Sequence, residues 1–427
     1  MTETPSQTTS VSGLLAEIAR IGTDSARGGY SRPVYSAAEL ELREWFTASA
    51  RQRSLEIEED RNGIIWAWWN PSGLPLADAV VTGSHLDSVP GGGAFDGPLG
   101  VASALAAIDA LQAADLRPTR PLALAVFPEE EGSRYGLACL GSQLMTGAVT
   151  PERAAALVDA DGTTFADLAA RNGLDPRGIG RDDERLSQIG CFVELHVEQG
   201  RGLIDQGRAI AIGSSILGHG RWRLSFSGQG NHAGTTLMNG RRDPMLAAAA
   251  SVLDVRRLGR AVEGARATVG KLDPIPGGSN VIASRVDVWL DVRHEDDAVV
   301  AALVTDIAAA AREHAAAEGC AVTLTEASMS PRVDFHPGLR GRLSTILPDA
   351  PILPTGAGHD AGVLKEEIPT AMLFVRNPTG ISHSPDEYVE DPDADAGGHA
   401  LATVLADLIT YTTSPPQHFP LIESDPT

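Results

Sequence analysis

The 427-residue sequence predicts an α/β protein with a large domain, residues 1–213 and 329–427, and a smaller inserted α+β domain, residues 214–328. In the large domain we expect a mostly parallel sheet flanked by helices. Two observations carry this prediction. Near-continuous apolar runs, typical of parallel strands covered on both faces, recur in the first half and near the end of the sequence. Between them, apolar and polar residues alternate, as in a sheet with one solvated face. The length also exceeds what one hydrophobic core usually serves.

In the large domain, apolar residues at helical spacing from Val11 to Ile21 predict a first helix, which Ser12 can cap. A polar segment, 163–188, is expected to be helical in part and has no assignable role. The tail, 414–427, is expected to be a loose terminus. The other expected elements are helices at 37–51, 99–111 and 393–411, and strands within 54–69, 80–84, 121–127, 190–200, 352–353 and 371–375.

The inserted domain is expected to have the element order β-α-β-β-α-β, which is that of a split βαβ sandwich. The alternation is clearest where Trp222, Leu224 and Phe226 share one face of a strand. The expected strands are 221–227, 265–272, 285–293 and 320–325, and the expected helices are 243–258 and 296–317.

Charge and composition limit the possible partners. Lys and Arg number 34 against 56 Asp and Glu, a net charge of −22, which argues against nucleic acid and against an anionic membrane surface. An anionic small substrate would need a local basic pocket. Cys139, Cys191 and Cys320 are odd in number and far apart, which suits a reducing compartment. The N-terminus does not have the pattern of a secretory signal, and no apolar stretch reaches the ~20 residues of a membrane span. We therefore expect a cytoplasmic protein.

The polar residues with the clearest chemical meaning follow the apolar runs. Residues 82–98, TGSHLDSVPGGGAFDGP, form a glycine-rich loop that contains His85, Asp87 and Asp96. Imidazole and carboxylate are the ligands that a catalytic Zn²⁺, Mn²⁺ or Co²⁺ takes. Taken alone, this loop is more simply a polar turn before a capped helix. Further polar clusters follow other strands, however, and the carboxyl ends of parallel strands meet at one edge of a sheet.

Five residues of the large domain are the candidate metal ligands: His85, Asp96, Glu131, His196 and His383. Such a set suits two ions that share a bridging carboxylate. We assign the bridge to Asp96, because its glycine-rich backbone allows a close approach. One ion would then be held by His85 and His196, and the other by Glu131 and His383.

Neighbouring carboxylates are candidates for supporting roles. Asp87 lies two residues after His85 and can orient its imidazole. The adjacent side chains of Glu130 and Glu131 diverge, so they cannot both bind one ion without strain. Glu130 is then free to act as general base for the attacking water and later as acid for the leaving nitrogen. Glu129 is a rival for this role.

The motifs GSHLDS, GGAFDG, EEGSRYG, ELHVEQG, NHAGTT, GGSNVI, DVR, GAGHDA and GISHSP occur in this order. Their order resembles that of the hydantoinase/carbamoylase-type amidases, a group that includes N-carbamoyl-L-amino acid amidohydrolases, allantoate amidohydrolases and β-ureidopropionases. These amidases belong to the metal-dependent aminoacylase and carboxypeptidase superfamily. The resemblance extends from about Ile18 to the last helix, and EEGSR and HVEQG are its most specific motifs.

The resemblance implies two divalent ions, Zn²⁺ or else Mn²⁺, Co²⁺ or Ni²⁺, held by the five candidate ligands, with Glu130 as general acid/base. It also implies that four residues hold the substrate: Gln199, His232, Asn280 and Arg293. Arg293 would clamp a carboxylate, and His232 would polarise the scissile carbonyl. The inserted domain would act as a lid and as the contact surface of a homodimer. Without the resemblance, Asn280 would be read as a turn former and Arg293 as a surface charge.

Two positions depart from the family pattern. Leu237 stands where proline commonly follows HAGTT, and Gly91-Gly92 replaces a more usual polar residue. Neither position is a candidate ligand, but both can shift substrate preference. His359 and Asp360 are expected to support the site from a loop rather than to bind an ion.

From these features we expect a metal-dependent amidohydrolase that cleaves a linear ureido or amide C–N bond of a small carboxylate substrate. An N-carbamoyl-L-amino acid is the leading candidate, with the amino acid, CO₂ and ammonia as products. Allantoate comes second and a β-ureido acid third. An aminoacylase or exopeptidase is disfavoured because EEGSR and HVEQG are typical of the amidase branch. A non-catalytic, metal-dependent binding protein on the same fold is the rival of a different class, and an intact Glu130 argues against it.

Overall fold

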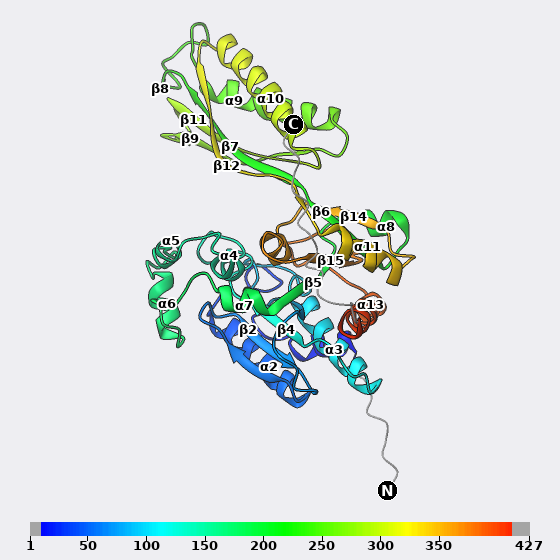
Figure 1. Ribbon diagram of the computed structural model, residues 1–427. Helices are drawn as coiled ribbons and strands as arrows, with labels where there is room; N and C mark the ends of the chain where they lie inside the picture. The colour runs from blue at the N-terminus through cyan, green and yellow to red at the C-terminus, as the bar shows by residue number, and fades with distance from the viewer. Residues whose placement is uncertain (1–9, 412–427) are drawn as a thin grey trace. The chain divides into compact units, whose positions relative to one another are not determined.

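The computed structural model describes residues 10–411, which divide into two compact units (Figure 1). The first unit consists of the chain up to Ser214 and from Phe335 onward, and the second unit is Ser215–Asp334. The tail expected to be loose, 414–427, lies outside the described residues.

The first unit is built on one large sheet with a parallel centre. Its strands are β1 (Glu56–Glu59), β2 (Ile65–Trp69), β3 (Ala79–His85), β4 (Leu122–Phe127), β5 (Ile189–Val197), β6 (Ile210–Ile216), β14 (Ile352–Thr355) and β15 (Thr370–Val375). They follow the order β1-β2-β4-β3-β5-β15-β6, and β14 also pairs with β6. The pairs β4/β3, β3/β5 and β5/β15 are parallel, while the pairs at the edges are antiparallel. The predicted mostly parallel sheet is confirmed.

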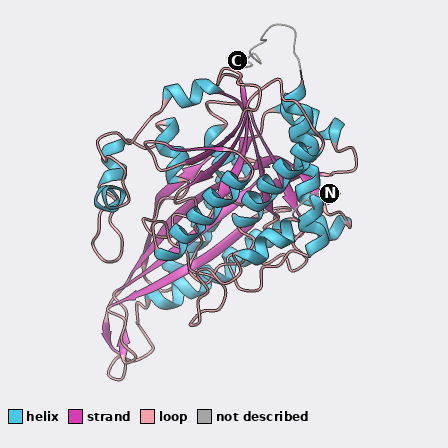
Figure 2. Ribbon diagram, turned by 90° about the horizontal axis from the view of Figure 1, so that it is seen from below, coloured by secondary structure: helices cyan, strands magenta, loops and turns pink. Residues whose placement is uncertain are grey.

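Helices cover both faces of this sheet (Figure 2). They are α1 (Val11–Glu17), α2 (Ala37–Gln52), α3 (Pro98–Ala113), α4 (Leu140–Thr146), α5 (Pro151–Ala155), α6 (Phe165–Arg171), α7 (Asp183–Gln188), α8 (Gly202–Gln206), α11 (Pro337–Ile346), α12 (Asp360–Leu364) and α13 (Asp391–Thr410). Helices α1, α3 and α13 pack together and share a core with alternate residues of β5, such as Val193 and Leu195. Because successive side chains of a strand point to opposite faces, the residues between them face the other layer, where α7 and α12 also contact β5.

The first helix starts before the serine that we expected to cap it. The hydroxyl of Ser10 accepts the N–H of Gly13 at 3.0 Å, so Ser10 is the cap and the prediction for Ser12 is wrong. Ser12 lies inside the first turn, and its N–H donates to Asp395 at 3.1 Å instead. The helix starts two residues too early for Ser12 to be its cap.

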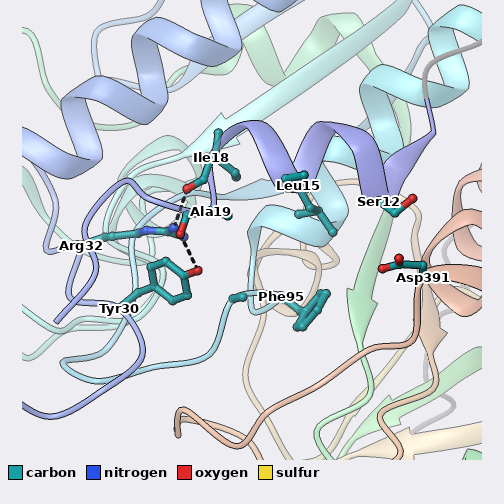
Figure 3. A pocket seen from close by; sticks show the side chains of 10 residues that line it. Ser12, Leu15, Ile18, Ala19, Tyr30, Arg32, Phe95 and Asp391 are labelled. Atoms are coloured by element: carbon teal, nitrogen blue, oxygen red, sulfur yellow. Dashed lines mark hydrogen bonds between the residues drawn. The ribbon is translucent and has the colours of Figure 1, made fainter. Parts of the chain in front are cut away.

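The chain after α1 folds back onto the loop that follows β3. Arg32 donates from Nε to the carbonyl of Ile21 at 2.9 Å. It also donates from Nη2 to the carbonyl of Ile18 at 3.4 Å (Figure 3). Its backbone exchanges hydrogen bonds with Ser88, at 3.0 and 3.1 Å. The segment around Arg32 therefore supports the glycine-rich loop predicted to hold metal ligands.

The polar segment 163–188 contributes α6 and α7, so the expectation that it is helical in part is confirmed. Phe165 and Leu168 of α6 are buried in a small separate cluster with Tyr135 and Leu140, which follow the acidic loop after β4. This segment therefore has a structural role, which its mostly polar composition hides.

The second unit has the predicted order of elements. They are β7 (Gly218–Ser227), α9 (Pro244–Ala261), β9 (Arg266–Ile275), β11 (Arg285–His294), α10 (Asp297–Ala317) and β12 (Ala321–Ser330). The antiparallel sheet has the order β12-β7-β11-β9, and α9 and α10 share a core with its buried side chains. A short ribbon, β8 (Asn231–His232) with β10 (Val281–Ile282), lies outside this sheet.

The second unit ends later than residue 328, where the sequence placed its boundary. Strand β12 continues past that position, and β13 (Val333–Asp334) then pairs with Ser215 and Ile216 at the start of the unit. The polar surface of β12 gave no signal of this length. Within residues 10–411, no helix is long and apolar enough to cross a membrane.

Candidate metal centre and active site

Four of the five predicted ligands lie at or after the carboxyl ends of central strands. His85 is the last residue of β3, and His196 is the last but one of β5. Glu131 follows β4, and His383 follows β15. Since β3, β4, β5 and β15 run parallel, their carboxyl ends lie at one edge of the sheet.

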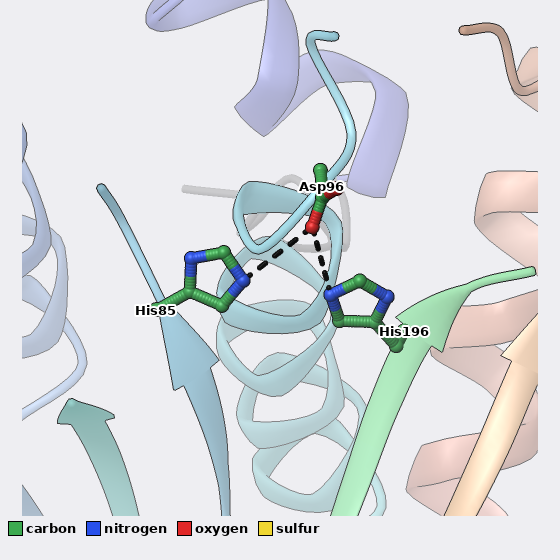
Figure 4. Close-up of side chains that lie close together, drawn as sticks. All are labelled: His85, Asp96 and His196. Atoms are coloured by element: carbon green, nitrogen blue, oxygen red, sulfur yellow. Dashed lines mark ion pairs between the residues drawn. The ribbon is translucent and has the colours of Figure 1, made fainter. Parts of the chain in front are cut away.

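His85, Asp96 and His196 form the first cluster (Figure 4). Asp96 Oδ1 lies 3.5 Å from Nε2 of His85 and 3.1 Å from Nε2 of His196. The Nδ1 atoms of the two histidines face the backbone oxygens of Asp87 at 3.0 Å and Val197 at 3.1 Å. Those contacts assign the ring protons to Nδ1, because a carbonyl can only accept. Both Nε2 lone pairs then point toward Asp96, as metal ligation requires.

Asp96, Glu131 and His383 form the second cluster. His383 Nε2 lies 3.4 Å from Asp96 Oδ2 and 3.3 Å from Glu131 Oε2. Within each cluster, the ligand atoms lie within 4.8 Å of one another. Asp96 thus turns one carboxylate oxygen to each cluster, which is the arrangement of a bridging ligand.

The donor atoms fit a divalent ion. Among the described residues, Nε2 of His85, Nε2 of His196 and Oε1 of Glu131 are buried without a hydrogen-bond partner. Buried polar atoms are normally paired, so unpaired ones in both clusters indicate bound ligands. Imidazole nitrogen and carboxylate oxygen are also the donors that Zn²⁺ and Mn²⁺ accept.

Asp87 connects the two strand ends. Its carboxylate accepts the backbone N–H groups of Glu130 at 3.2 Å and Glu131 at 3.1 Å. The distance from Asp87 Oδ1 to His85 Nδ1 is 3.5 Å, whereas the backbone oxygen of Asp87 lies 3.0 Å from the same nitrogen. Asp87 therefore orients His85 mainly through the main chain, while its side chain fixes the two glutamates.

Glu130 and Glu131 diverge, as expected for neighbours in the chain. Glu130 Oε2 lies 3.7 Å from His85 Nε2, whereas Glu131 faces His383. Burial, together with repulsion from Asp360 and other carboxylates, raises the pKa of Glu130 well above its usual value, against the attraction of His85. A raised pKa makes Glu130 a stronger base.

Glu129 has a different position from Glu130. It is fully buried, and its Oε1 accepts the N–H groups of Arg134 at 3.0 Å and Tyr135 at 2.7 Å. Burial is the main cause that raises the pKa of Glu129, to about 8. These contacts hold the loop after β4 in place, so Glu129 is a weaker candidate than Glu130 for the general base.

Glu387 is a site residue that the sequence analysis missed. Its Oε1 accepts the N–H groups of Phe95 at 3.2 Å and Asp96 at 3.0 Å, and its Oε2 accepts the hydroxyl of Ser382 at 3.1 Å. Any Cβ on Gly93 would lie 2.2 Å from Glu387, which explains the glycine there. Burial raises the pKa of Glu387 to about 7. Nothing in the spacing around GISHSP pointed to Glu387, because its contacts are with backbone far away in sequence.

The residues after His196 point in two directions. Gln199 Nε2 donates to Asp96 Oδ2 and to Ser382 Oγ, both at 2.9 Å, so Gln199 lies at the metal clusters. Glu198 instead accepts the N–H groups of Gly202 at 2.6 Å and Leu203 at 3.0 Å, at the start of α8. Glu198 therefore pairs with the first two N–H groups of α8 and not with a metal ligand.

Three more buried groups lie near the ligands. The ring of His359 lies 4.5 Å from that of His196 (centroid to centroid), tilted by 58°, and burial keeps the pKa of His359 well below its usual value. Asp360 accepts the hydroxyl of Ser142. Glu194, also missed in the sequence, accepts the hydroxyl of Ser84 at 3.1 Å. His359 and Asp360 are outside both clusters of potential ligand atoms, in line with a supporting role.

The remaining predicted substrate residues, His232, Asn280 and Arg293, belong to the second unit. The β8/β10 ribbon brings His232 and Asn280 together, since the N–H of Ala233 donates to the Asn280 carbonyl at 3.0 Å. Nδ1 of His232 accepts the N–H groups of Gly234 and Thr235 at 3.1 and 3.2 Å. In the neutral ring the proton is therefore on Nε2, which can donate outward.

Arg293 is engaged within its own strand. Its Nε and Nη2 donate to the two carboxylate oxygens of Asp291, at 2.8 and 3.0 Å. Leu237, the position that departs from the family pattern, is 80% exposed on the loop after His232. A side chain so exposed can contact a ligand. A proline at this position would present a side chain of a different shape.

Comparison with known proteins gives the class of the protein. Over 91% of its length, the chain is 33% identical to 95% of an N-carbamoyl-L-amino acid amidohydrolase of Geobacillus stearothermophilus. Over 92% of its length, it is 31% identical to 95% of an allantoate amidohydrolase of Escherichia coli K12. A solved amidase of the hydantoinase/carbamoylase family from Burkholderia multivorans superposes with a TM-score of 0.85, at 29% identity, over 94% of this chain and 98% of that one.

Fold, site and relatives define a hydrolase that acts on C–N bonds of linear amides. Residues 81–407 match the model of peptidase family M20/M25/M40, and the chain belongs to this family. The resemblance to the hydantoinase/carbamoylase-type amidases is confirmed.

Proposed function

We propose that this amidohydrolase cleaves the ureido C–N bond of an N-carbamoyl-L-amino acid. The observation that carries the proposal is the pair of clusters that share Asp96, with Glu130 beside them. A relative that bears the name of this activity covers most of the chain. The acidic surface requires that the substrate carboxylate be met by a specific cation, and Arg293 is our candidate.

We assign two divalent ions to the site, Zn²⁺ or else Mn²⁺, Co²⁺ or Ni²⁺. His85, Asp96 and His196 would hold one, and Asp96, Glu131 and His383 the other. When bound, such ions lower the pKa of water and polarise carbonyl oxygens. The protein supplies the fixed tautomers, the bridging carboxylate and a buried base.

Glu130 carries the proton through the reaction. Its carboxylate takes a proton from the attacking water and gives it to the departing nitrogen, which leaves as an amine. The raised pKa of Glu130 favours the first transfer. The products are the free amino acid, CO₂ and ammonia.

The second unit holds the substrate in this proposal. Arg293 clamps the carboxylate, His232 donates from Nε2 to the scissile carbonyl, and Asn280 and Gln199 add hydrogen bonds. The unit would act as a lid and as the contact of a homodimer. The buried positions of Cys139 and Cys191, both free thiols, suit the reducing cytoplasm that we propose as its location.

Allantoate is the second candidate substrate, because a relative named for it is nearly as similar as the first. A β-ureido acid is a third. An aminoacylase or exopeptidase, or a non-catalytic metal-dependent binding protein, has less support, since the motifs favour the amidase branch and Glu130 is intact.

Ammonia release from a panel of ureido acids tests the proposal. The panel contains N-carbamoyl-L-amino acids, their D-isomers, allantoate and β-ureidopropionate. Each is assayed with and without a chelator, and after restoring Mn²⁺, Co²⁺, Ni²⁺ or Zn²⁺. We expect turnover of an N-carbamoyl-L-amino acid that chelation abolishes and metal restores. If allantoate is preferred, it becomes the proposed substrate in place of an N-carbamoyl-L-amino acid. Full turnover by protein shown to be metal-free would refute the two-metal site.

A further inference from the structure

A cavity of about 240 Å³ lies in the first unit, away from the predicted ligands, between α1 and the loop that precedes Asp96. In Figure 3, Arg32 and Tyr30 lie at one end, Leu15 and Phe95 flank the middle, and Ser12 and Asp391 lie at the other end. The volume is below the about 300–1,000 Å³ of typical ligand pockets, so the cavity suits a small fragment-sized molecule.

Arg32 is unusual among the buried arginines of the described residues. The other three all have a carboxylate partner: Arg43 pairs with Glu39, Arg53 with Asp109 and Arg185 with Glu58. Arg32 is only 1% exposed and forms no ion pair within residues 10–411. Burying an unpaired charge is costly, so this cation is expected to have a compensating partner.

Among the described residues, the bonds that Arg32 does make leave Nη1 of its guanidinium unpaired, although this atom is buried. Nε and Nη2 donate to the carbonyls of Ile21 and Ile18, and the guanidinium carbon lies 4.0 Å above the centre of the Tyr30 ring. Carbonyl dipoles and an aromatic face offset only part of a full charge. Burial lowers the pKa of Arg32 to about 10, which still leaves it protonated at neutral pH.

We propose that this cavity binds a small monocarboxylic acid, whose carboxylate pairs with Arg32 and whose short apolar chain lies between Leu15 and Phe95. The carboxylate of Asp391 at the opposite end disfavours a second negative charge, so dicarboxylates bind poorly. This site is separate from the metal clusters and does not depend on the proposed catalytic function. A ligand here would touch Phe95, the neighbour of Asp96, and so lie behind the loop that carries the bridging residue.

Pentanoate is the probe, measured by ligand-observed NMR on the full chain and located by a crystal soak. Pentanamide, which has nearly the same shape without the charge, and glutarate, which has a second carboxylate, are the comparison ligands. We expect pentanoate to bind about tenfold or more tightly than pentanamide, because a hydrogen bond between two charged groups is stronger than one to a neutral amide.

Variants separate this cavity from any binding at the metal clusters. Ala16→Leu adds a larger side chain at an exposed position of α1 that lines the cavity and keeps Arg32 in place, and leucine is a good helix former. Arg32→Met removes the charge, and Arg20→Met is the matched control on an exposed arginine outside the cavity. We expect Ala16→Leu to abolish pentanoate binding, Arg32→Met to weaken it about tenfold, and Arg20→Met to leave it unchanged.

Equal binding of pentanoate by wild type and Ala16→Leu, or no binding by wild type, would overturn the proposal. Arg32 would then serve only to hold the carbonyls after α1. If Arg32→Met does not fold, Ala16→Leu and the comparison with pentanamide still decide the question.

Discussion

Replacing Glu130 by glutamine separates proton transfer from metal binding. The Glu130 side chain is buried with Oε2 at 3.7 Å from His85 Nε2, and glutamine fits the same space. The amide cannot accept a proton from water or deliver one to the leaving nitrogen. A positioned acid/base group is worth about 10²–10⁴-fold, or about 2.7–5.4 kcal/mol in activation free energy at 1.36 kcal/mol per decade. Because one residue would perform both transfers, we expect the upper half of this range.

The assay is kcat and KM on the best substrate of the ureido panel, with metal content by elemental analysis on the same samples. For Glu130→Gln we expect full metal content, a KM close to that of wild type and the loss in kcat. Glu131→Gln should lower metal content, because an amide is a poorer ligand than a carboxylate. Glu129→Gln should be mild, since the amide oxygen can still accept the N–H groups of Arg134 and Tyr135.

Two results would refute this reasoning. An active Glu130→Gln variant would show that Glu130 is not the base. An inactive Glu129→Gln variant with full metal content and an unchanged melting temperature would move that role to Glu129.

Three further predictions follow from single contacts. Arg293→Lys should lower kcat/KM by about 2–4 kcal/mol, because an ammonium cannot grip a carboxylate with two parallel bonds; unchanged kinetics would remove Arg293 from the substrate site. Glu387→Ala should lower the melting temperature and the metal affinity, since each backbone N–H left unpaired costs about 1–3 kcal/mol; calorimetry with and without metal checks this, and Glu387→Gln, which keeps one acceptor, is the milder control. Gly97→Ala should lower metal content, because Gly97 has a φ of +86° and a Cβ would lie 2.6 Å from the His85 ring; normal metal content would contradict the packing argument.

The sequence predicted those parts of the fold that repeat a local pattern. The apolar runs of β3, β4 and β15 and the alternation of β7 and β11 each reflect what the two faces of the strand meet. Strand β6 was missed, and so were the short helices α4, α5, α8, α11 and α12. Most of these helices have fewer than eight residues, too few for a clear helical period.

The candidate ligands could be found because each stands just past an apolar run. Glu194 and Glu387 could not, for a physical reason. Glu194 lies within a strand among apolar residues. Only its tertiary contacts mark it as part of the site: it accepts hydrogen bonds from the Ser84 hydroxyl and from the N–H of Ala361. Glu387 acts on backbone groups 291 and 292 residues away in the chain. Contacts of this kind depend on tertiary packing and leave no local periodicity.

The electrostatics of the site give a reason for its choice of a divalent cation. Burial raises the pKa of Glu131 to about 9, and repulsion from Asp96 adds to this effect. These carboxylates repel one another in a region from which water is excluded, and a single positive charge offsets only one of them. A divalent cation held by Asp96 and Glu131 would relieve both the burial cost and the repulsion of these carboxylates, which favours its binding.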